Sequence, residues 1–130
     1  MSTPSLALSS NRAGVIVRLK GEPRFLSAHL VRRFVPPPTL SDVAGTGLTM
    51  ALVDGQVLAI IAVGPRGSAL TVCDVGGELV GLLGADPEAV GFFEPLGAGV
   101  AFRGGMAAEL DVAELVRASA HGTFEQEAEA

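Results

Sequence analysis

Two neighbouring stretches decide the fold: LTMALVDGQVLAIIAV at residues 48–63 and SALTVCDVGGELVGLL at residues 68–83. Each consists of two aliphatic runs separated by a dipeptide, Asp54-Gly55 in the first and Gly76-Gly77 in the second. Both dipeptides readily adopt the positive φ angles that a two-residue hairpin turn requires. The sequence therefore predicts two successive β-hairpins, with the strands Leu48–Val53 and Val57–Val63, then Ser68–Val75 and Glu78–Leu83.

The side-chain pattern of these strands predicts how they are covered. Val57–Val63 is apolar at both odd and even positions, and Leu79–Leu83 and Val90–Phe93 share this feature. A strand with one face in water would alternate apolar and polar residues instead. Strands that are apolar on both faces need a second layer, so we expect a mainly β fold. Two small barrels packed on one another fit this pattern better than one barrel.

The segments before the hairpins indicate further strands. Residues Gly14–Lys20 alternate, Gly21-Glu22-Pro23 turns the chain, and Arg24–Val35 resumes an extended pattern. Pro36-Pro37-Pro38 must end that strand, because consecutive prolines donate no ladder hydrogen bonds. Thr39–Gly47 is predicted to be a loop or a single helical turn.

The end of the chain predicts a short C-terminal helix, from Val112 to about Ser119. Asp111 is a suitable N-cap, and Glu114 follows it at the spacing of a capping box. The apolar positions of this helix share one face, which should dock: Val112, Leu115 and Val116. We expect a flexible segment at residues 1–12, one domain with two β subdomains at 13–119, and an acidic tail at 120–130.

Composition limits the class of protein. The chain of 130 residues is 48% hydrophobic but only 5% aromatic, with no Trp or Tyr, so aliphatic side chains must form the core. We expect a cytoplasmic protein, because the N-terminus lacks a signal-peptide pattern and the longest apolar run is too short to span a bilayer. Cys73 is the single cysteine, so no internal disulfide can form.

Charge is distributed unevenly along the chain. Residues 1–40 hold six basic residues and one acid, whereas residues 41–130 hold three basic residues and thirteen acids. The fold can bring these halves together as a mixed surface or separate them into two poles, and the sequence favours neither. The acidic balance argues against nucleic-acid binding.

Residues with catalytic potential are few and scattered. Cys73 lies within LTVCDV, where a buried, inert thiol is the usual occupant. His29 is predicted to be a surface or strand-edge residue, and His121 lies near the end of the chain. No His/Cys cluster has metal-ligand spacing, and the glycines lack phosphate-loop spacing. We therefore expect no enzyme activity, no metal and no cofactor.

Binding remains as the function that the residues favour. Arg32-Arg33 should direct one guanidinium to each face of a strand, and Phe92-Phe93 should place one ring on each side of a strand. For both pairs a plain structural role, as solvated charge or core, is the competing interpretation. A two-faced apolar strand that is partly open would be a docking surface.

The order of these elements resembles CheW-like domains, the chemotaxis coupling-protein family. The first hairpin, MALVDGQVLAIIAVG, and the second, with its continuation SALTVCDVGGELVGLLGADPEAVGFF, carry most of the resemblance. FLSAHLVRRFVPPPTL is similar to the family's extended segment before a Pro-containing loop, and the closing ELDV to its C-terminal Leu-Asp stretch. The resemblance covers Gly14–Ala118, most of the chain.

The chain departs from the family pattern at its first hairpin. The family has Asn-Leu-Arg-Gly where this chain has Leu52, Val53, Asp54 and Gly55, so a positive charge is replaced by a negative one. Ala59 and Ala62 stand where the family has proline and aspartate. The chain therefore resembles a short and diverged member.

The resemblance implies a fold of two small intertwined SH3-like β-barrels packed on a shared aliphatic core. It also implies a non-enzymatic adaptor in a bacterial chemosensory pathway, or in a diverged motility or polarity pathway. Such an adaptor docks onto the regulatory domain of a histidine kinase, a chemoreceptor, or another CheW-like domain. The residues that we expect at the protein interface are Arg32, Arg33, Phe34, Asp54, Gln56, Leu58 and Ile60.

A small ligand-binding β-barrel, or an accessory subunit of an enzyme, is the alternative function. It requires a pocket on which polar groups converge. The polar residues available in the strands for such a pocket are Thr49, Gln56, Thr71 and Asp74.

Overall fold

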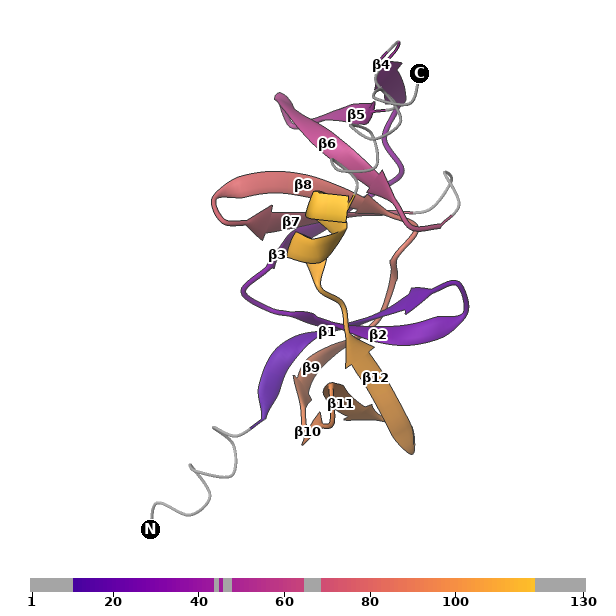
Figure 1. Cartoon of the computed structure of the whole chain (residues 1–130), viewed down its shortest axis with the longest axis vertical. Helices are drawn as coiled ribbons and strands as arrows, with labels where there is room; N and C mark the ends of the chain where they lie inside the picture. Colours follow the sequence, from indigo (N-terminus) through magenta and orange to yellow (C-terminus); the bar gives the residue numbers. More distant parts are fainter. Residues whose placement is uncertain (1–10, 44, 46–47, 65–68, 119–130) are drawn as a thin grey trace.

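The computed structural model describes residues 11–43, 45, 48–64 and 69–118, and these form two six-stranded sheets (Figure 1). Sheet A has the strand order β10-β11-β12-β2-β1-β9, and sheet B has the order β3-β7-β8-β6-β5-β4. The strands are β1 (Arg12–Leu19), β2 (Glu22–Ser27), β3 (Val31–Val35), β4 (Leu40–Val43), β5 (Leu48–Val53), β6 (Gln56–Ala62), β7 (Leu70–Val75), β8 (Glu78–Leu83), β9 (Asp86–Phe93), β10 (Pro95–Leu96), β11 (Gly99–Phe102) and β12 (Gly105–Glu109).

The chain passes from one sheet to the other and back. It builds β1 and β2 in sheet A, β3 to β8 in sheet B, and β9 to β12 in sheet A again. Most neighbours pair antiparallel, but β12 pairs with β2 and β6 pairs with β8 in parallel, which joins distant parts of the chain. This topology confirms the predicted mainly β fold with two intertwined barrel-like units.

Both predicted hairpins are present. The φ angles are 50° and 81° at Asp54-Gly55, and 62° and 92° at Gly76-Gly77. Two consecutive positive φ angles give the mirror-image turn whose twist matches that of paired strands. Each turn therefore joins its two strands directly, β5 to β6 and β7 to β8.

The buried apolar residues form three clusters, one within each sheet and one between the sheets. The cluster in sheet A is formed by Ile16, Phe25, Val100 and Ala107. The cluster in sheet B is formed by Ala51, Val53, Leu58, Ile60, Leu70, Val72 and Leu83. The third joins both sheets and the C-terminal helix, and contains Val15, Val17, Leu26, Cys73, Val80, Leu82, Ala85 and Val112. This third cluster is the predicted shared aliphatic core.

Two predictions about the N-terminal half were wrong. Thr39–Gly47, predicted as a loop or helical turn, contains strand β4, which pairs with β5 along its whole length. Arg24–Val35 is not one extended stretch, because β2 ends at Ser27 and a turn precedes β3. In that turn the Leu30 amide donates to the Ser27 carbonyl at 3.0 Å. Strand pairing decides both features, because β4 pairs with β5 and β3 pairs with β7.

The first turn lies one residue earlier than predicted. Lys20 and Gly21 have φ angles of 51° and 84°, and Glu22 already begins β2. Pro23 therefore lies in a strand opposite Arg18 instead of in the turn.

The expectation that the apolar strands are covered on both faces was correct only for part of sheet B. Residues 70–73 of β7 and 80–83 of β8 are buried on both faces. In β6, however, Val57 is 62% exposed, and in β9 Val90 and Phe92 are 75% and 72% exposed. These side chains continue the apolar faces of the sheets beyond the area that the second layer covers.

The predicted helix occupies residues 112–118. The Asp111 carboxylate accepts a hydrogen bond from the Glu114 amide at 3.0 Å, which confirms the N-cap. The Glu114 carboxylate pairs with Arg117 on the same helix at 2.8 Å. Within the described part of the chain, no helix combines the length and apolar character needed to cross a membrane. The predicted helix end at Ser119, the tail at 120–130 and residues 1–10 lie outside the described residues.

Candidate protein-docking groove

An apolar groove runs between the two sheets, where edge strand β9 of sheet A faces edge strand β3 of sheet B. The groove is lined by Ala13, Gly14, Val15, Ala28, Val31, Arg32, Arg33, Phe34, Val90, Gly91 and Phe92. It contains three of the residues predicted for the interface: Arg32, Arg33 and Phe34.

The β9 wall of the groove continues the shared core outward. Val15 of β1 is 5% exposed and lies opposite Val90 of β9, which is 75% exposed. Ala13 lies opposite Phe92 in the same register. Because paired residues share a face of the sheet, a buried apolar surface continues without interruption into an exposed one.

The neighbouring Phe93 has the opposite environment. Its ring contacts Phe25 at 6.0 Å and Phe102 at 6.3 Å between centroids, in edge-to-face geometry inside the sheet A unit. Phe92-Phe93 therefore places one ring on each side of β9, as predicted. Phe93 fixes the strand, and Phe92 is left 72% exposed at the groove.

The β3 wall carries the two adjacent arginines. Arg32 forms an ion pair with Asp74 of β7, and Arg33 forms one with Asp54 in the β5–β6 turn. The Arg32 guanidinium, together with a 2.8 Å hydrogen bond from the Gly77 amide, lowers the pKa of Asp74. Both arginine side chains are exposed, at 58% and 45%. They form a polar rim beside the apolar groove.

The other predicted interface residues lie in the β5–β6 hairpin, away from the groove lining. Asp54 and Gln56 are exposed at its turn. Leu58 and Ile60 are 3% and 7% exposed and belong to the core of sheet B, so they are not surface residues. Val57 is the outward neighbour. Because both faces of this strand are apolar, no polar residue indicated which of the alternate positions point outward.

The predicted interface did not include Val90, Leu52 or Val57, and Phe92 was predicted to be either a core or a surface residue. Their exposure depends on where the opposing layer ends, which is a property of the tertiary structure. Because Val90–Phe93 is apolar at odd and even positions alike, the sequence did not indicate which of its side chains face outward.

The thiol and imidazole candidates are separate from one another. Cys73 is fully buried, and this burial raises the pKa of its thiol to about 11, so it is protonated at neutral pH. The predicted buried thiol is thus confirmed. His29 is exposed in the turn between β2 and β3, where its Nδ1 lies 2.9 Å from Ser27 Oγ. In the described residues no three His, Cys, Asp or Glu side chains form a potential metal site.

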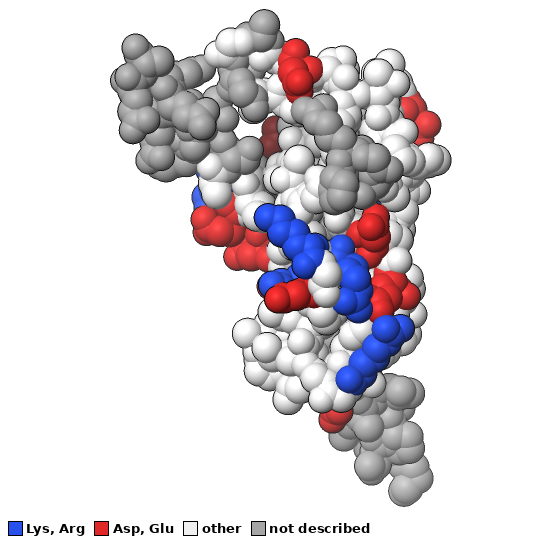
Figure 2. All heavy atoms as spheres, turned by 90° about the vertical axis from the view of Figure 1, so that its right-hand side faces the viewer, with Lys and Arg blue, Asp and Glu red and all other residues white. Residues whose placement is uncertain are grey.

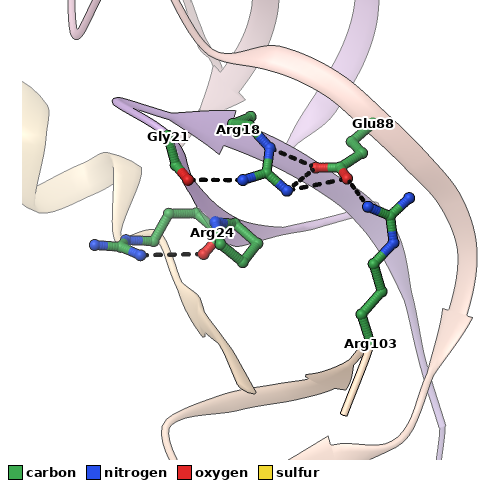
Figure 3. A network of polar contacts seen from close by, with 6 residues as sticks. Arg18, Gly21, Arg24, Glu88 and Arg103 are labelled. Atoms are coloured by element: carbon green, nitrogen blue, oxygen red, sulfur yellow. Dashed lines mark hydrogen bonds and ion pairs between the residues drawn. The ribbon is translucent and has the colours of Figure 1, made fainter. Parts of the chain in front are cut away.

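Glu88 of β9 is at the centre of a polar network (Figure 3). Arg18 of β1 donates from Nε and Nη2 to its two carboxylate oxygens, both at 3.0 Å, and Arg103 approaches from the β11–β12 turn at 2.6 Å. Arg18 also donates to the Gly21 carbonyl at 2.6 Å. The network therefore connects three separate parts of sheet A through one carboxylate.

The two oppositely charged halves of the sequence come together as a mixed surface. Each of four basic residues from the first 40 positions pairs with an acid from the later part of the chain: Arg12 with Glu109, Arg18 with Glu88, Arg32 with Asp74 and Arg33 with Asp54. Figure 2 shows basic and acidic side chains next to one another on one face. This settles the question that the sequence left open.

The polar residues needed by a small-ligand pocket are dispersed. Thr49 donates to Asp42 on the neighbouring strand at 2.8 Å, and Gln56 is exposed at a turn. Thr71 is buried and donates to the Ala85 carbonyl at 3.3 Å, whereas Asp74 binds Arg32. These four side chains do not converge on one pocket, so the structure offers no support for the ligand-binding alternative.

Comparison with known proteins gives a structural match and no sequence match. No family model matches the chain, and no curated protein matches it by sequence. Among solved structures, the chain is similar to scaffolding protein TtCheW from Thermoanaerobacter tengcongensis, with a TM-score of 0.65 and 14% identity. The match covers 78% of this chain and 89% of the TtCheW chain. The resemblance inferred from the sequence is therefore confirmed for the architecture: this chain has a diverged CheW-like fold.

Proposed function

We propose that this protein is a non-enzymatic adaptor of a chemosensory signalling pathway, acting in the cytoplasm. Its partners are the regulatory domain of a chemotaxis-type histidine kinase, a chemoreceptor, or another CheW-like domain. The proposal is supported by the CheW-like fold and by the description of TtCheW as a scaffolding protein. A pathway for motility or cell polarity would use the same docking mechanism.

The observation that carries the proposal is the exposure of Val90 and Phe92 at the groove, at 75% and 72%. Burying a valine or phenylalanine side chain contributes roughly 1.5–3 kcal/mol. The two together can therefore supply a substantial part of a micromolar affinity, which corresponds to about 8 kcal/mol. Arg32 and Arg33 at the rim would fix the orientation of the partner.

The charge at Asp54 is paired with an arginine of the groove lining. The CheW-like pattern has an arginine there, whereas Asp54 is bound by Arg33 of β3. The corner therefore holds a guanidinium paired with a carboxylate, and β3 supplies that guanidinium instead of the hairpin turn. We infer that partner recognition at this corner uses Arg33.

The test is a titration of the isotope-labelled protein with two unlabelled candidates, a kinase regulatory domain and a receptor cytoplasmic tip. We expect one of them to shift NMR signals of Val31, Phe34, Val90 and Phe92. The double variant Val90→Ser/Phe92→Ser should weaken binding by about tenfold or more without unfolding. Shifts confined to surfaces other than the groove, or unchanged binding by the double variant, would refute docking at the groove.

A further inference from the structure

A second apolar surface lies at the opposite edge of sheet B. The groove adjoins edge strand β3, whereas β4 forms the other edge, next to β5 and β6. The exposed apolar side chains here are Val43 (37%), Leu48 (39%), Leu52 (66%) and Val57 (62%). Together with the half-buried Met50, they are called the open face below.

The register shows that the open face is one half of a surface whose other half is core. A row of paired residues crosses the sheet from Cys73 through Val80, Ala59 and Met50 to Ser41. Cys73 and Val80 are buried in the shared core, at 0% and 5% exposure, whereas Ala59 and Ser41 are exposed. The sheet therefore presents one largely apolar face, which the shared core covers over β7, β8 and Ile61 of β6 and leaves open over β5 and β4.

The protein's own helix shows what kind of element this face accepts. Val112 is buried in the shared core with Val80, and Leu115 and Val116 pack against the same cluster. Val116 also lines a shallow hollow with Met50, Val57 and Glu78, at the border of the open face. Three strands at about 4.8 Å spacing offer a width similar to the roughly 10 Å diameter of a helix. One further helix can therefore lie beside residues 112–118.

The charges around the open face indicate which charge the polar side of such a helix should carry. In the described residues of β4, β5, β6 and β8 and the β5–β6 turn, every charged residue is acidic: Asp42, Asp54 and Glu78. On the neighbouring helix, Arg117 is paired with Glu114. Asp54 is bound by Arg33, whereas Glu78 lines the hollow itself. Two copies joined through this face would bring like charges together, which disfavours self-association.

We propose that the open face is a second docking site, which binds an amphipathic helix of a partner protein. That helix carries aliphatic residues at helical spacing and a Lys or Arg that faces Glu78. The inference goes beyond the proposed function, because it assigns a role to a surface outside the groove lining. It does not depend on the identity of the groove's partner.

The experiment uses two synthetic helical peptides with the same aliphatic positions and one Trp, one flanked by Lys and the other by Glu. Because the protein has no Trp or Tyr, Trp fluorescence reports only the peptide. We expect saturable binding of the Lys peptide, and binding of the Glu peptide that is about tenfold or more weaker. Glu78→Lys should reverse this order.

Matched double variants separate the two sites. Leu52→Ser/Val57→Ser should weaken binding of the Lys peptide about tenfold or more, whereas Val90→Ser/Phe92→Ser should leave it unchanged. The proposal is overturned if the Lys peptide does not bind at ~100 μM, or if both peptides bind equally. Loss of binding in the groove variant alone would also overturn it.

Two other occupants of the open face have distinct signatures. If a second copy covers the face, sedimentation will show a dimer that Leu52→Ser/Val57→Ser dissociates. If the chain's own C-terminal residues cover it, the Lys peptide will bind only to a variant that ends at residue 118. Either result would replace the proposed partner helix.

Discussion

The two hairpins of sheet B are similar in sequence and different in environment. Each has two aliphatic strands and a turn with two positive φ angles. The β7–β8 hairpin is buried on both faces, between the core of sheet B and the core shared with sheet A. The β5–β6 hairpin has the first of these covers but reaches the second through Ile61 of β6, and it leaves Leu52 and Val57 exposed. An aliphatic strand thus shows that a face can be buried, and the rest of the fold decides whether it is.

Aspartate substitutions at two adjacent positions of β6 should give the largest difference in stability. Leu58 is 3% exposed in the core of sheet B, and Val57 is 62% exposed on the open face. Leu58→Asp buries an unpaired charge and should cost more than about 4 kcal/mol, which is enough to unfold a typical domain of this size. Val57→Asp should change stability by only about 0.5 kcal/mol. Circular dichroism during denaturation distinguishes them.

If both aspartate variants are folded and equally stable, the assignment of the inner face of β6 is incorrect. If both are unfolded, the open face is covered in solution. Either outcome would remove the contrast between the two hairpins.

Two leucine-to-alanine variants compare the stability contributed by a side chain under the second layer with that of a side chain outside it. Leu82 of β8 is fully buried in the shared core, whereas Leu52 of β5 is 66% exposed. Leu82→Ala should lower the free energy of unfolding by roughly 2–5 kcal/mol, because it removes packed atoms and leaves a cavity. Leu52→Ala should lower it by no more than about 0.5 kcal/mol. Urea unfolding gives both values, and equal losses would contradict the account.

Removing the helix N-cap should have an intermediate effect on stability. The Asp111 carboxylate accepts the Glu114 amide hydrogen bond at 3.0 Å, so Asp111→Ala should cost about 1 kcal/mol. Asp111→Asn retains an acceptor and should restore most of that loss. If Asp111→Ala leaves the urea midpoint unchanged, residues 112–118 contribute little to the shared core.

Much of the fold could be predicted from local sequence. Gly-containing turns fixed both hairpins, Asp111 fixed the helix start, and the aliphatic strands predicted a layered β fold with a shared core. The prediction failed where strand pairing and tertiary packing decide. Strand β4 forms because β5 lies beside it, and Val57, not Leu58, points outward because of where the sheet B core sits. The groove residues Arg32, Arg33 and Phe34 were identified, but Val90 was not.

The smallest expected effect on stability concerns Asp74, beside the β7–β8 turn. The Arg32 guanidinium and the Gly77 amide hold the pKa of Asp74 below its ordinary value. The ionised carboxylate therefore stabilises the protein at neutral pH, and this stabilisation is lost as the pH falls through the folded-state pKa. Asp74→Asn should lower the thermal midpoint slightly at pH 7 and not at strongly acidic pH. Glu78→Gln at the same turn is the control, and an Asp74→Asn effect independent of pH would contradict the ion pair.

The proposed adaptor function depends on whether the exposed apolar groove is a docking site. Isothermal titration calorimetry with a chemosensory kinase regulatory domain and a receptor cytoplasmic tip measures this most directly. We predict saturable binding to at least one of them, with the negative heat-capacity change that apolar burial produces. Val90→Ser/Phe92→Ser should weaken that binding by about tenfold or more while its urea midpoint stays unchanged. No binding to either at ~100 μM, or full binding by the double variant, would contradict the account.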